Sequence, residues 1–308
     1  ESYEPGSTFK PVTVASALEE GVVKDGDTYV CKGFETVADY KLKCHVFSTI
    51  GSHGSLTVEQ ALMNSCNPYM IHLALEMGNS RFAYYQSLFG FGKITGIDLP
   101  GETTGIVYGD RMTTIDAACN SFGQTINVNM MQMMAAYCSI INGGMLYQPH
   151  IVKRIESANG EVVKEYKANL VRQTITASTS KLLRRYLKNT VEEGTAKKAG
   201  VTGYSVAGKT GTAQKGDRKD NKWIISFIGH APAENPKFAI YVVIDEPYGT
   251  TGTSGSSADV LTLTHNILEK LLPYMNVYKD ASDEYEDTSS SPDELTVDGI
   301  PAGTASSN

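Results

Sequence analysis

The feature that most constrains how this 308-residue chain can fold is a serine followed three residues later by a lysine at a helix start. Ser7 and Lys10 lie in the stretch Glu4–Pro11, and the apolar residues that follow predict a helix ending near Gly21. Residues three apart lie on the same side of a helix, so the Lys10 amine can reach the Ser7 hydroxyl. A lysine activates a serine only when burial or a nearby cation lowers the pKa of its amine. Taken alone, the pattern more often describes a helix start with an exposed lysine.

A second motif, Ser65-Cys66-Asn67, follows in a predicted connection between two helices. Thr57 and Gln60 have the spacing of a capping box, which predicts a short helix just before the motif. Pro68 favours the first turn of a second helix, for which we expect Asn67 to be the N-cap. The motif therefore lies in a tight turn, where its side chains can point into a cleft.

A third motif, Lys209-Thr210-Gly211-Thr212, lies on the first of three late segments rich in Val, Ile, Tyr and Phe. These segments, residues 204–213, 223–229 and 238–245, predict strands, with a hairpin turn between the last two. Helical patterns cover about 81–89, 129–142, 178–193 and 256–272. We therefore expect an α+β fold in which helices flank a central antiparallel sheet.

The three motifs contain the groups that an acyl transfer needs, namely a nucleophile, a base, oxyanion donors and a site for the substrate carboxylate. The candidate catalytic groups are Ser7 as nucleophile, Lys10 as base, and Ser65 with Lys209 as a proton relay to the leaving amine. Lys209 would also lower the pKa of Lys10. The candidate substrate-binding groups are Asn67 for an amide, Thr210 and Thr212 for a carboxylate, Gly211 for a close substrate backbone, and the Ser7 and Thr212 N–H groups for the oxyanion. The structural alternative is that the second and third motifs are only a turn with a cap and a strand with a bulge.

The ordered set of Ser-x-x-Lys, Ser-x-Asn and Lys-Thr-Gly resembles the signature of penicillin-binding proteins and class A β-lactamases. Over roughly residues 1–275, the chain resembles the transpeptidase domain of a monofunctional (class B) penicillin-binding protein of the sporulation or division type. The stretches that add to this resemblance are Glu4–Pro11, Phe89–Gly92, Gly96–Glu102, Phe122–Gln124, Asn142–Gly144 and Gly203–Gln214. In that family, strands and a helix before the active serine complete the central sheet, whereas this sequence begins six residues before Ser7.

The resemblance implies a β-lactamase/transpeptidase-like fold and a peptidoglycan D,D-transpeptidase that works through an acyl-serine and needs no cofactor for its chemistry. In such enzymes the serine attacks the D-Ala-D-Ala carbonyl of one stem peptide, D-Ala leaves, and an amine of a neighbouring stem takes the acyl group. The resemblance also implies that stem peptides and β-lactam antibiotics bind, that a membrane-embedded glycosyltransferase is a partner, and that the domain acts on the extracytoplasmic face of the bacterial cytoplasmic membrane.

Two other kinds of function use the same three motifs. One is hydrolytic, as in a D,D-carboxypeptidase or a β-lactamase, although we can place no glutamate as a class A-type deacylating base. The other is a non-catalytic sensor domain for β-lactams or muropeptides. The sequence contexts Glu4–Pro11 and Gly203–Gln214 favour the transpeptidase over both alternatives.

Cys31, Cys44, His45 and His53 fall within 23 residues, just before the second motif. Cysteine and histidine are ligands of structural zinc, but this spacing is not that of a standard zinc finger. It resembles a cysteine-bearing loop in some sporulation and division enzymes of this class from Gram-positive anaerobes. That resemblance implies a structural zinc held by Cys31, Cys44 and His53, with Asp39 or His45 as fourth ligand. A Cys31–Cys44 disulfide and two free thiols are the alternatives.

The charges divide the chain into a nearly neutral part and an acidic end. Residues from Asp280 onward include eight acidic and no basic residues, so residues 1–279 carry a net charge of +1. No basic patch with interleaved aromatic residues stands out, which excludes nucleic acid as an expected partner. We predict one transpeptidase domain over residues 1–275 and a disordered acidic tail over residues 276–308.

Overall fold

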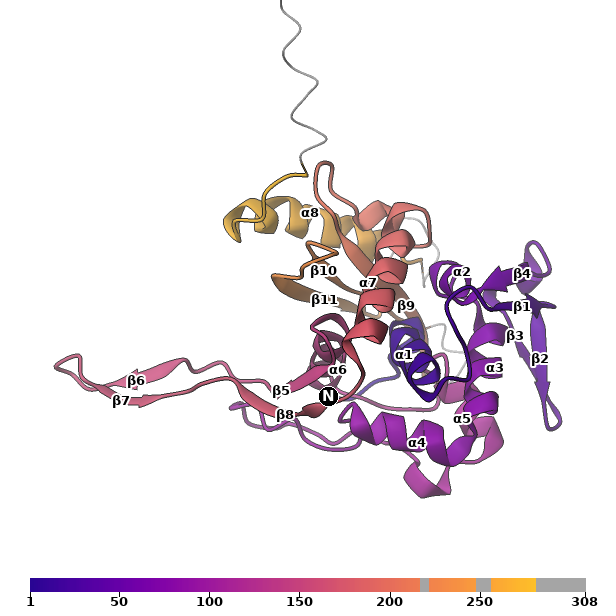
Figure 1. Cartoon of the computed structure of the whole chain (residues 1–308), viewed down its shortest axis with the longest axis horizontal. Coiled ribbons are helices and arrows are strands. Elements are labelled where there is room, and N and C mark those ends of the chain that lie inside the picture. The colour runs from indigo at the N-terminus through magenta and orange to yellow at the C-terminus, as the bar shows by residue number, and fades with distance from the viewer. Residues whose placement is uncertain (217–221, 248–255, 281–308) are drawn as a thin grey trace, which may run out of the picture.

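The computed structural model describes residues 1–216, 222–247 and 256–280 (Figure 1). Its helices are α1 (Lys10–Glu20), α2 (Val58–Met63), α3 (Asn67–Met77), α4 (Asn79–Leu88), α5 (Thr114–Asn120), α6 (Met130–Ile141), α7 (Ala177–Glu192) and α8 (Ala258–Tyr274). Short 3₁₀ helices are η1 (Gly6–Phe9), η2 (His45–Ser48), η3 (Gly109–Arg111) and η4 (Lys197–Ala199). Its strands are β1 (Thr28–Cys31), β2 (Phe34–Val37), β3 (Tyr40–Lys43), β4 (Gly54–Thr57), β5 (Met145–Gln148), β6 (Arg154–Glu156), β7 (Val162–Glu165), β8 (Asn169–Gln173), β9 (Ala207–Lys215), β10 (Lys222–Ala231) and β11 (Phe238–Asp245).

The central feature is the antiparallel sheet β11–β10–β9, formed by the three late segments as predicted. β10 lies in the middle, where Ile225 is opposite Thr212 of β9 and Ile244 of β11. Successive side chains of a strand point to opposite faces. Ile225 and Phe227 accordingly join a buried cluster with α8, whereas Ile228 joins the larger core with α1, α3 and α7. Helices cover both faces of the sheet (Figure 1), which confirms the predicted α+β architecture.

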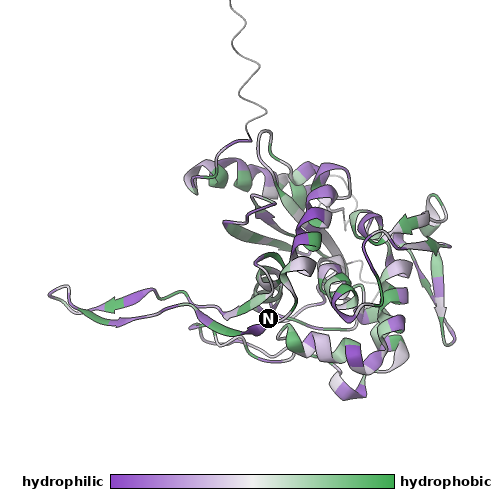
Figure 2. Ribbon diagram, in the orientation of Figure 1, coloured by the Kyte–Doolittle hydropathy of each residue, from purple (hydrophilic) through white to green (hydrophobic). Residues whose placement is uncertain are grey.

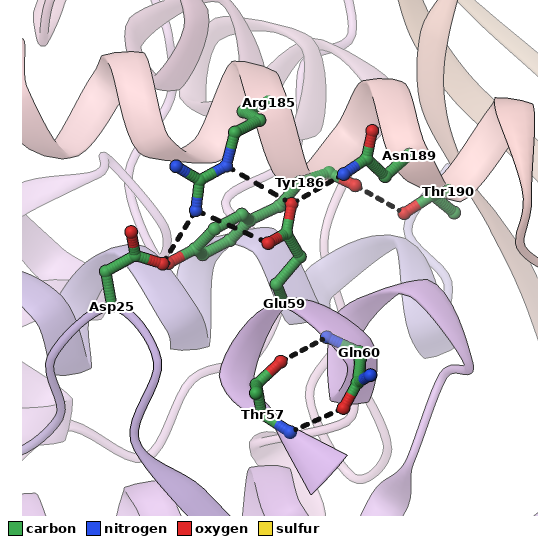
Figure 3. A network of polar contacts seen from close by, with 8 residues as sticks. All are labelled: Asp25, Thr57, Glu59, Gln60, Arg185, Tyr186, Asn189 and Thr190. Atoms are coloured by element: carbon green, nitrogen blue, oxygen red, sulfur yellow. Dashed lines mark hydrogen bonds and ion pairs between the residues drawn. The ribbon is translucent and has the colours of Figure 1, made fainter.

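Helix α7 is tied to its neighbours by a polar network (Figure 3). Arg185 donates from Nη2 to Asp25 Oδ1 at 2.6 Å and from Nε to Glu59 Oε1 at 3.3 Å. Tyr186 also donates to Asp25, and Asn189 donates to Glu59. Exposed ion pairs contribute little individually, so α7 is held mainly by its apolar side, while its outward turns carry hydrophilic residues (Figure 2). The network links α7 to α2, which leads directly into the second motif.

The helix boundaries follow local features of the sequence, with one exception. Gly21 ends α1 with a φ of 78°, and Thr57 and Gln60 form the predicted capping box of α2 (Figure 3). The prediction that Asn67 caps α3 is wrong. Cys66 occupies the N-cap without a side-chain hydrogen bond, because the Asn67 side chain is bonded to Lys10 instead.

The segment between α1 and α2 consists of short strands and loops. β1 pairs with β4, and β2 pairs with β3, in two small antiparallel sheets. Cys31 at the end of β1 lies opposite Gly54 at the start of β4. Residues 31–53, here called the cysteine loop, therefore leave and rejoin the body at one place, beside α3 (Figure 1).

The sequence does not predict the long arm that projects from the body in Figure 1. This arm spans residues 145–173, with β5 paired to β8 near its base and β6 paired to β7 farther out. The outer strands β6 and β7 have no buried face, since Ile155, Val162 and Val163 are exposed like the charged residues between them. The alternating pattern that marks a half-buried strand is therefore missing.

No helix among the described residues is long and apolar enough to span a bilayer. The predicted acidic tail lies outside the described residues from residue 281 onward. The domain boundary at residue 275 and the disorder of the tail therefore stay predictions.

Candidate active site

Ser7 lies in the 3₁₀ helix η1, immediately before α1. Residues i and i+3 stand in line in a 3₁₀ helix, so Lys10, the first residue of α1, follows Ser7 on the same side. Gly6 has a φ of 56°, and a Cβ added there would lie 2.7 Å from the carbonyl oxygen of Thr212. Gly6 also donates its N–H to the carbonyl of Gly123 at 2.9 Å. These contacts hold the serine between β9 and the Gly123 turn.

The Lys10 side chain is completely buried, and its amine faces the second motif. The Nζ atom donates to the Ser65 carbonyl at 2.6 Å, to Ser65 Oγ at 3.0 Å and to Asn67 Oδ1 at 2.7 Å. Burial lowers the pKa of Lys10 to about 8, although Cys44 and Cys66 act in the opposite direction. A substantial fraction of this lysine can therefore be neutral near pH 8.

Ser65 is held in an unusual backbone conformation. Its φ of 56° lies in the left-handed region, which residues other than glycine rarely adopt. Such conformations cost about 1–3 kcal/mol and are concentrated at functional sites. Within the described residues no hydrogen bond joins Lys10 Nζ to Ser7 Oγ, so the serine bonded to the candidate base is Ser65.

Lys209 is the second completely buried lysine of the site. Its Nζ donates to the Thr210 carbonyl at 3.2 Å and lies 3.4 Å from Thr210 Oγ1. Burial, with repulsion from Lys10 as a second cause, holds the pKa of Lys209 well below its usual range. Burial is thus the main cause of the low pKa of both amines, and repulsion between them adds to it at Lys209.

A cavity of about 350 Å³ connects the three motifs, and we call it the catalytic cavity. Ser7, Ser65, Asn67, Thr210 and Thr212 line it, from η1, from the α2–α3 connection and from β9. The tertiary structure therefore brings together residues that lie up to about two hundred positions apart in the chain. A second cavity, of about 440 Å³, is lined by none of the motif residues.

Further residues line the catalytic cavity, and sequence reasoning assigned them no catalytic role. These are His45, Phe122, Gln124, Thr195, Trp223 and Ser257. Gln124 had a sequence signal only through the resemblance, and His45 only as a candidate metal ligand. Thr195 and Ser257 belong to none of the sequence motifs. The folding of distant segments brings them to the cavity.

The structure changes the interpretation of Gly211. Thr210 and Thr212 line the cavity, whereas Gly211 belongs to the opposite face of β9. A Cβ added to Gly211 would lie 2.5 Å from Ser226 Oγ and 2.8 Å from Thr8 Cγ2. Glycine is needed here because η1 packs closely on the strand. That a substrate backbone lies against this edge strand stays a prediction.

Four sulfur and nitrogen ligands gather beside the catalytic cavity. One ligand atom from each of Cys31, Cys44, His53 and Cys66 lies within 4.8 Å of the others, and the three cysteines are buried. His53 Nδ1 lies 3.8 Å from Cys31 Sγ and 3.6 Å from Cys44 Sγ. Tetrahedral zinc, with bonds of about 2.3 Å to sulfur and about 2.05 Å to nitrogen, would separate such ligands by about 3.6 Å. The four residues, here called the Cys₃His cluster, therefore fit a zinc ion.

The structure corrects the fourth ligand from Asp39 or His45 to Cys66. Sequence reasoning missed Cys66 because it lies between the two functional residues of the second motif, outside the cysteine loop. His45 Nδ1 is 3.8 Å from Cys44 Sγ, but His45 belongs to the cavity wall. None of the five cysteines, all of which lie in the described residues, forms a disulfide, so the alternative of a Cys31–Cys44 disulfide is not present.

The fold and the cavity define the class of this protein. A serine before a buried lysine, a Ser-x-Asn turn and a Lys-Thr-Gly strand around one cavity are the arrangement of serine acyl-transfer proteins that react with β-lactams. The chain belongs to the family described as penicillin binding protein transpeptidase domain, which matches residues 1–269.

Similar proteins of known role are class B penicillin-binding proteins. Stage V sporulation protein D of Bacillus subtilis is 41% identical over 282 residues, covering 90% of this chain and 43% of that protein. Peptidoglycan D,D-transpeptidase FtsI of Escherichia coli K12 is 32% identical over 285 residues, covering 91% of this chain and 45% of that protein. The chain thus spans less than half the length of these relatives, and the resemblance to the sporulation and division type is confirmed.

Solved structures confirm the β-lactamase/transpeptidase-like fold. Penicillin-binding protein 3 of Mycobacterium tuberculosis, complexed with aztreonam, has a TM-score of 0.81 and 29% identity, covering 91% of this chain and 64% of that chain. The D,D-transpeptidase domain of a peptidoglycan glycosyltransferase from Eggerthella lenta has a TM-score of 0.79 and 27% identity. The match covers 90% of this chain and 67% of that chain.

Proposed function

We propose that this chain is the catalytic domain of a peptidoglycan D,D-transpeptidase. The observation that carries the proposal is the catalytic cavity, which Ser7 and Ser65 line beside the buried amines of Lys10 and Lys209. A buried amine with a pKa of about 8 is suited to remove a proton from a serine near neutral pH. Membership of the transpeptidase family and similarity to FtsI support this reaction.

In the proposed acylation, Ser7 Oγ attacks the carbonyl carbon between the two D-alanines of a stem peptide. Neutral Lys10 takes the hydroxyl proton, after its hydrogen bonds to the second motif rearrange toward Ser7. When the peptide C–N bond breaks, the proton on Lys10 passes through the Ser65 hydroxyl to the leaving D-alanine amine, and Lys209 supports this transfer electrostatically. Lys10 is then neutral again. The Ser7 ester keeps the rest of the donor peptide.

The same cavity offers groups that bind and polarise the donor peptide. The N–H groups of Ser7 and Thr212 are proposed to stabilise the oxyanion, since the close contact of Gly6 with the Thr212 carbonyl brings the two segments together. The Thr210 and Thr212 side chains line the cavity and suit the terminal carboxylate. Asn67 is proposed to bind the amide that precedes the scissile bond.

The second half of the reaction transfers the acyl group to an amine of a neighbouring stem peptide. The amine attacks the Ser7 ester, its proton passes back to the base, and the serine hydroxyl is restored. β-Lactams would acylate the same serine, because their strained amide takes the place of the D-Ala-D-Ala peptide bond. The similarity to a structure that is complexed with aztreonam supports this reactivity.

We infer that the domain acts on the extracytoplasmic face of the cytoplasmic membrane, where peptidoglycan is assembled. Cross-linking needs glycan strands, so a membrane-embedded glycosyltransferase is the proposed partner. We also propose residues 1–275 as the catalytic unit and residues 276–308 as a tail that takes no part in the reaction.

Intact-mass spectrometry of the full-length protein tests the function. We expect benzylpenicillin to add one antibiotic mass that is retained for many minutes, with the modified peptide containing Ser7. Incubation with a stem pentapeptide and an acceptor amine should release D-alanine and give the cross-linked peptide.

Each rival function predicts a different result in the same assays. Rapid release of hydrolysed penicillin would identify a β-lactamase, and D-alanine release without cross-linking would identify a carboxypeptidase. A stable penicillin adduct without any turnover of stem peptide would identify a sensor. Any of these results would overturn the transpeptidase proposal.

We further propose that the Cys₃His cluster holds a structural zinc ion. Cys31, Cys44 and Cys66 would bind as thiolates and His53 through Nδ1, so that the cysteine loop is fastened to the turn between α2 and α3. The buried cysteines and the ligand separations support a closed site, which takes no part in the chemistry.

Native mass spectrometry should find one zinc mass per chain, and Cys31→Ser should lose it. We expect this variant to melt roughly 5–10 °C lower, because metal binding adds directly to folding free energy. Cys138→Ser is the matched control, since Cys138 lies on α6 outside the cluster, and it should retain the metal. Equal metal content in wild type and Cys31→Ser would overturn the zinc proposal.

A further inference from the structure

Among the residues that line the catalytic cavity, His45 is the one contributed by the cysteine loop. We propose that His45 is a specificity residue, which hydrogen-bonds a carboxylate on the part of the acyl donor that precedes the scissile bond. This inference rests on the proposed function, because it assigns the ligand chemistry of one wall of the same cavity. It is independent of the zinc proposal.

The position of His45 follows from contacts between the cysteine loop and Asn67. Asn67 Oδ1 accepts a hydrogen bond from Lys10, and its Nδ2 donates to the Lys43 carbonyl at 3.3 Å. Asn67 thus lies between the buried base and the backbone of the cysteine loop. His45, two residues after Lys43, lines the same cavity as Asn67.

The direction of a bound donor then brings its remaining part to His45. The terminal carboxylate is assigned to the threonines of β9, the scissile carbonyl to Ser7, and the preceding amide to Asn67. A chain that passes Asn67 next meets the cysteine loop. There His45 is the side chain by which the cysteine loop lines the cavity, and its ring can form a hydrogen bond.

The chemistry of this wall favours an anionic group. Nδ1 of His45 is engaged with Cys44 Sγ at 3.8 Å, and the ring is exposed, which leaves Nε2 for a ligand. The ammonium groups of Lys41 and Lys43 lie 5.3 and 4.9 Å from the centre of the Phe47 ring, in the same 3₁₀ helix as His45. This local excess of positive charge attracts a carboxylate more strongly than a neutral side chain.

Two penicillins test the assignment, because carbenicillin is benzylpenicillin with one added side-chain carboxylate. We expect His45→Ala to lower the second-order acylation rate constant for carbenicillin about tenfold, the size typical of a lost hydrogen bond to a charged group. The rate constant for benzylpenicillin should change less than about twofold. His45→Gln, which keeps a hydrogen-bond donor, should recover part of the carbenicillin rate.

The controls separate this proposal from its alternatives. His150→Ala removes an exposed histidine at the base of the arm and should leave both rate constants unchanged. Equal losses for both penicillins in His45→Ala, or a loss accompanied by release of the metal, would show that His45 acts through the fold and would overturn the assignment. If wild-type protein reacts with neither penicillin, the proposed transpeptidase function fails, which is a distinct result.

Discussion

Ser7→Ala is expected to abolish covalent labelling by penicillin and to lower cross-linking by on the order of 10⁴-fold or more. Ser7 is the serine that η1 holds between β9 and the Gly123 turn, and it lines the catalytic cavity. Without its hydroxyl no acyl-enzyme can form. The remaining groups could only bind the donor peptide, so non-covalent penicillin binding should persist.

Intact-mass spectrometry measures the labelling, and thermal unfolding shows that the variant is folded. The matched control is Ser16→Ala, which removes another serine from the same segment. Ser16 is buried on α1 and donates to the Val12 carbonyl, outside the cavity. Its variant should label at the wild-type rate. A stable adduct on Ser7→Ala would mean that a different residue is the nucleophile.

Lys10→Met is expected to slow acylation by about 10²–10⁴-fold, the contribution typical of a general base. Methionine has a similar shape and no amine, and it removes a buried cation whose charged form is costly to desolvate. It also leaves the Ser65 carbonyl and Asn67 Oδ1 without their donor. Thermal unfolding therefore accompanies the rate measurement.

The pH dependence gives a sharper test of Lys10. Burial depresses its pKa to about 8, and only the neutral amine can accept the Ser7 proton. The acylation rate constant of the wild type should therefore rise with pH and level off above about 8. Below that value it should fall about tenfold for each pH unit. The Lys10→Met profile should lack this rise.

The control for this prediction is Lys24→Met, which removes an exposed lysine outside the catalytic cavity. It should keep both the rate and the pH profile of the wild type. A Lys10→Met rate within about threefold of the wild type, with the same pH profile, would assign the base to another group. Lys209 would then be the candidate, since its pKa is also held low by burial.

Local sequence features predicted much of the fold because they act over a few residues. The left-handed Gly21 at the end of α1 and the Thr57–Gln60 capping box are determined by neighbouring residues alone. The strands of the central sheet were recognised from their apolar and β-branched composition. The arm at residues 145–173 was missed because its outer strands β6 and β7 are exposed on both faces, and so they lack the alternation of a half-buried strand.

The motif residues themselves were predicted from the sequence, whereas the direction of several side chains was not. Asn67 was expected to cap α3, but it is bonded to Lys10 and to the Lys43 carbonyl. Gly211 accommodates the close packing of η1 on β9, a role that its sequence neighbours do not reveal. In both cases a contact between distant segments decides what surrounds the residue.

The sequence by itself determined the three motifs, the α+β class and the family of this chain, because residue type and spacing carry that information. Only the tertiary structure decided that Cys66 completes the Cys₃His cluster and that His45 lines the catalytic cavity. Both facts depend on how the cysteine loop folds back on the turn between α2 and α3. That contact joins residues separated in the chain, and no local pattern encodes it.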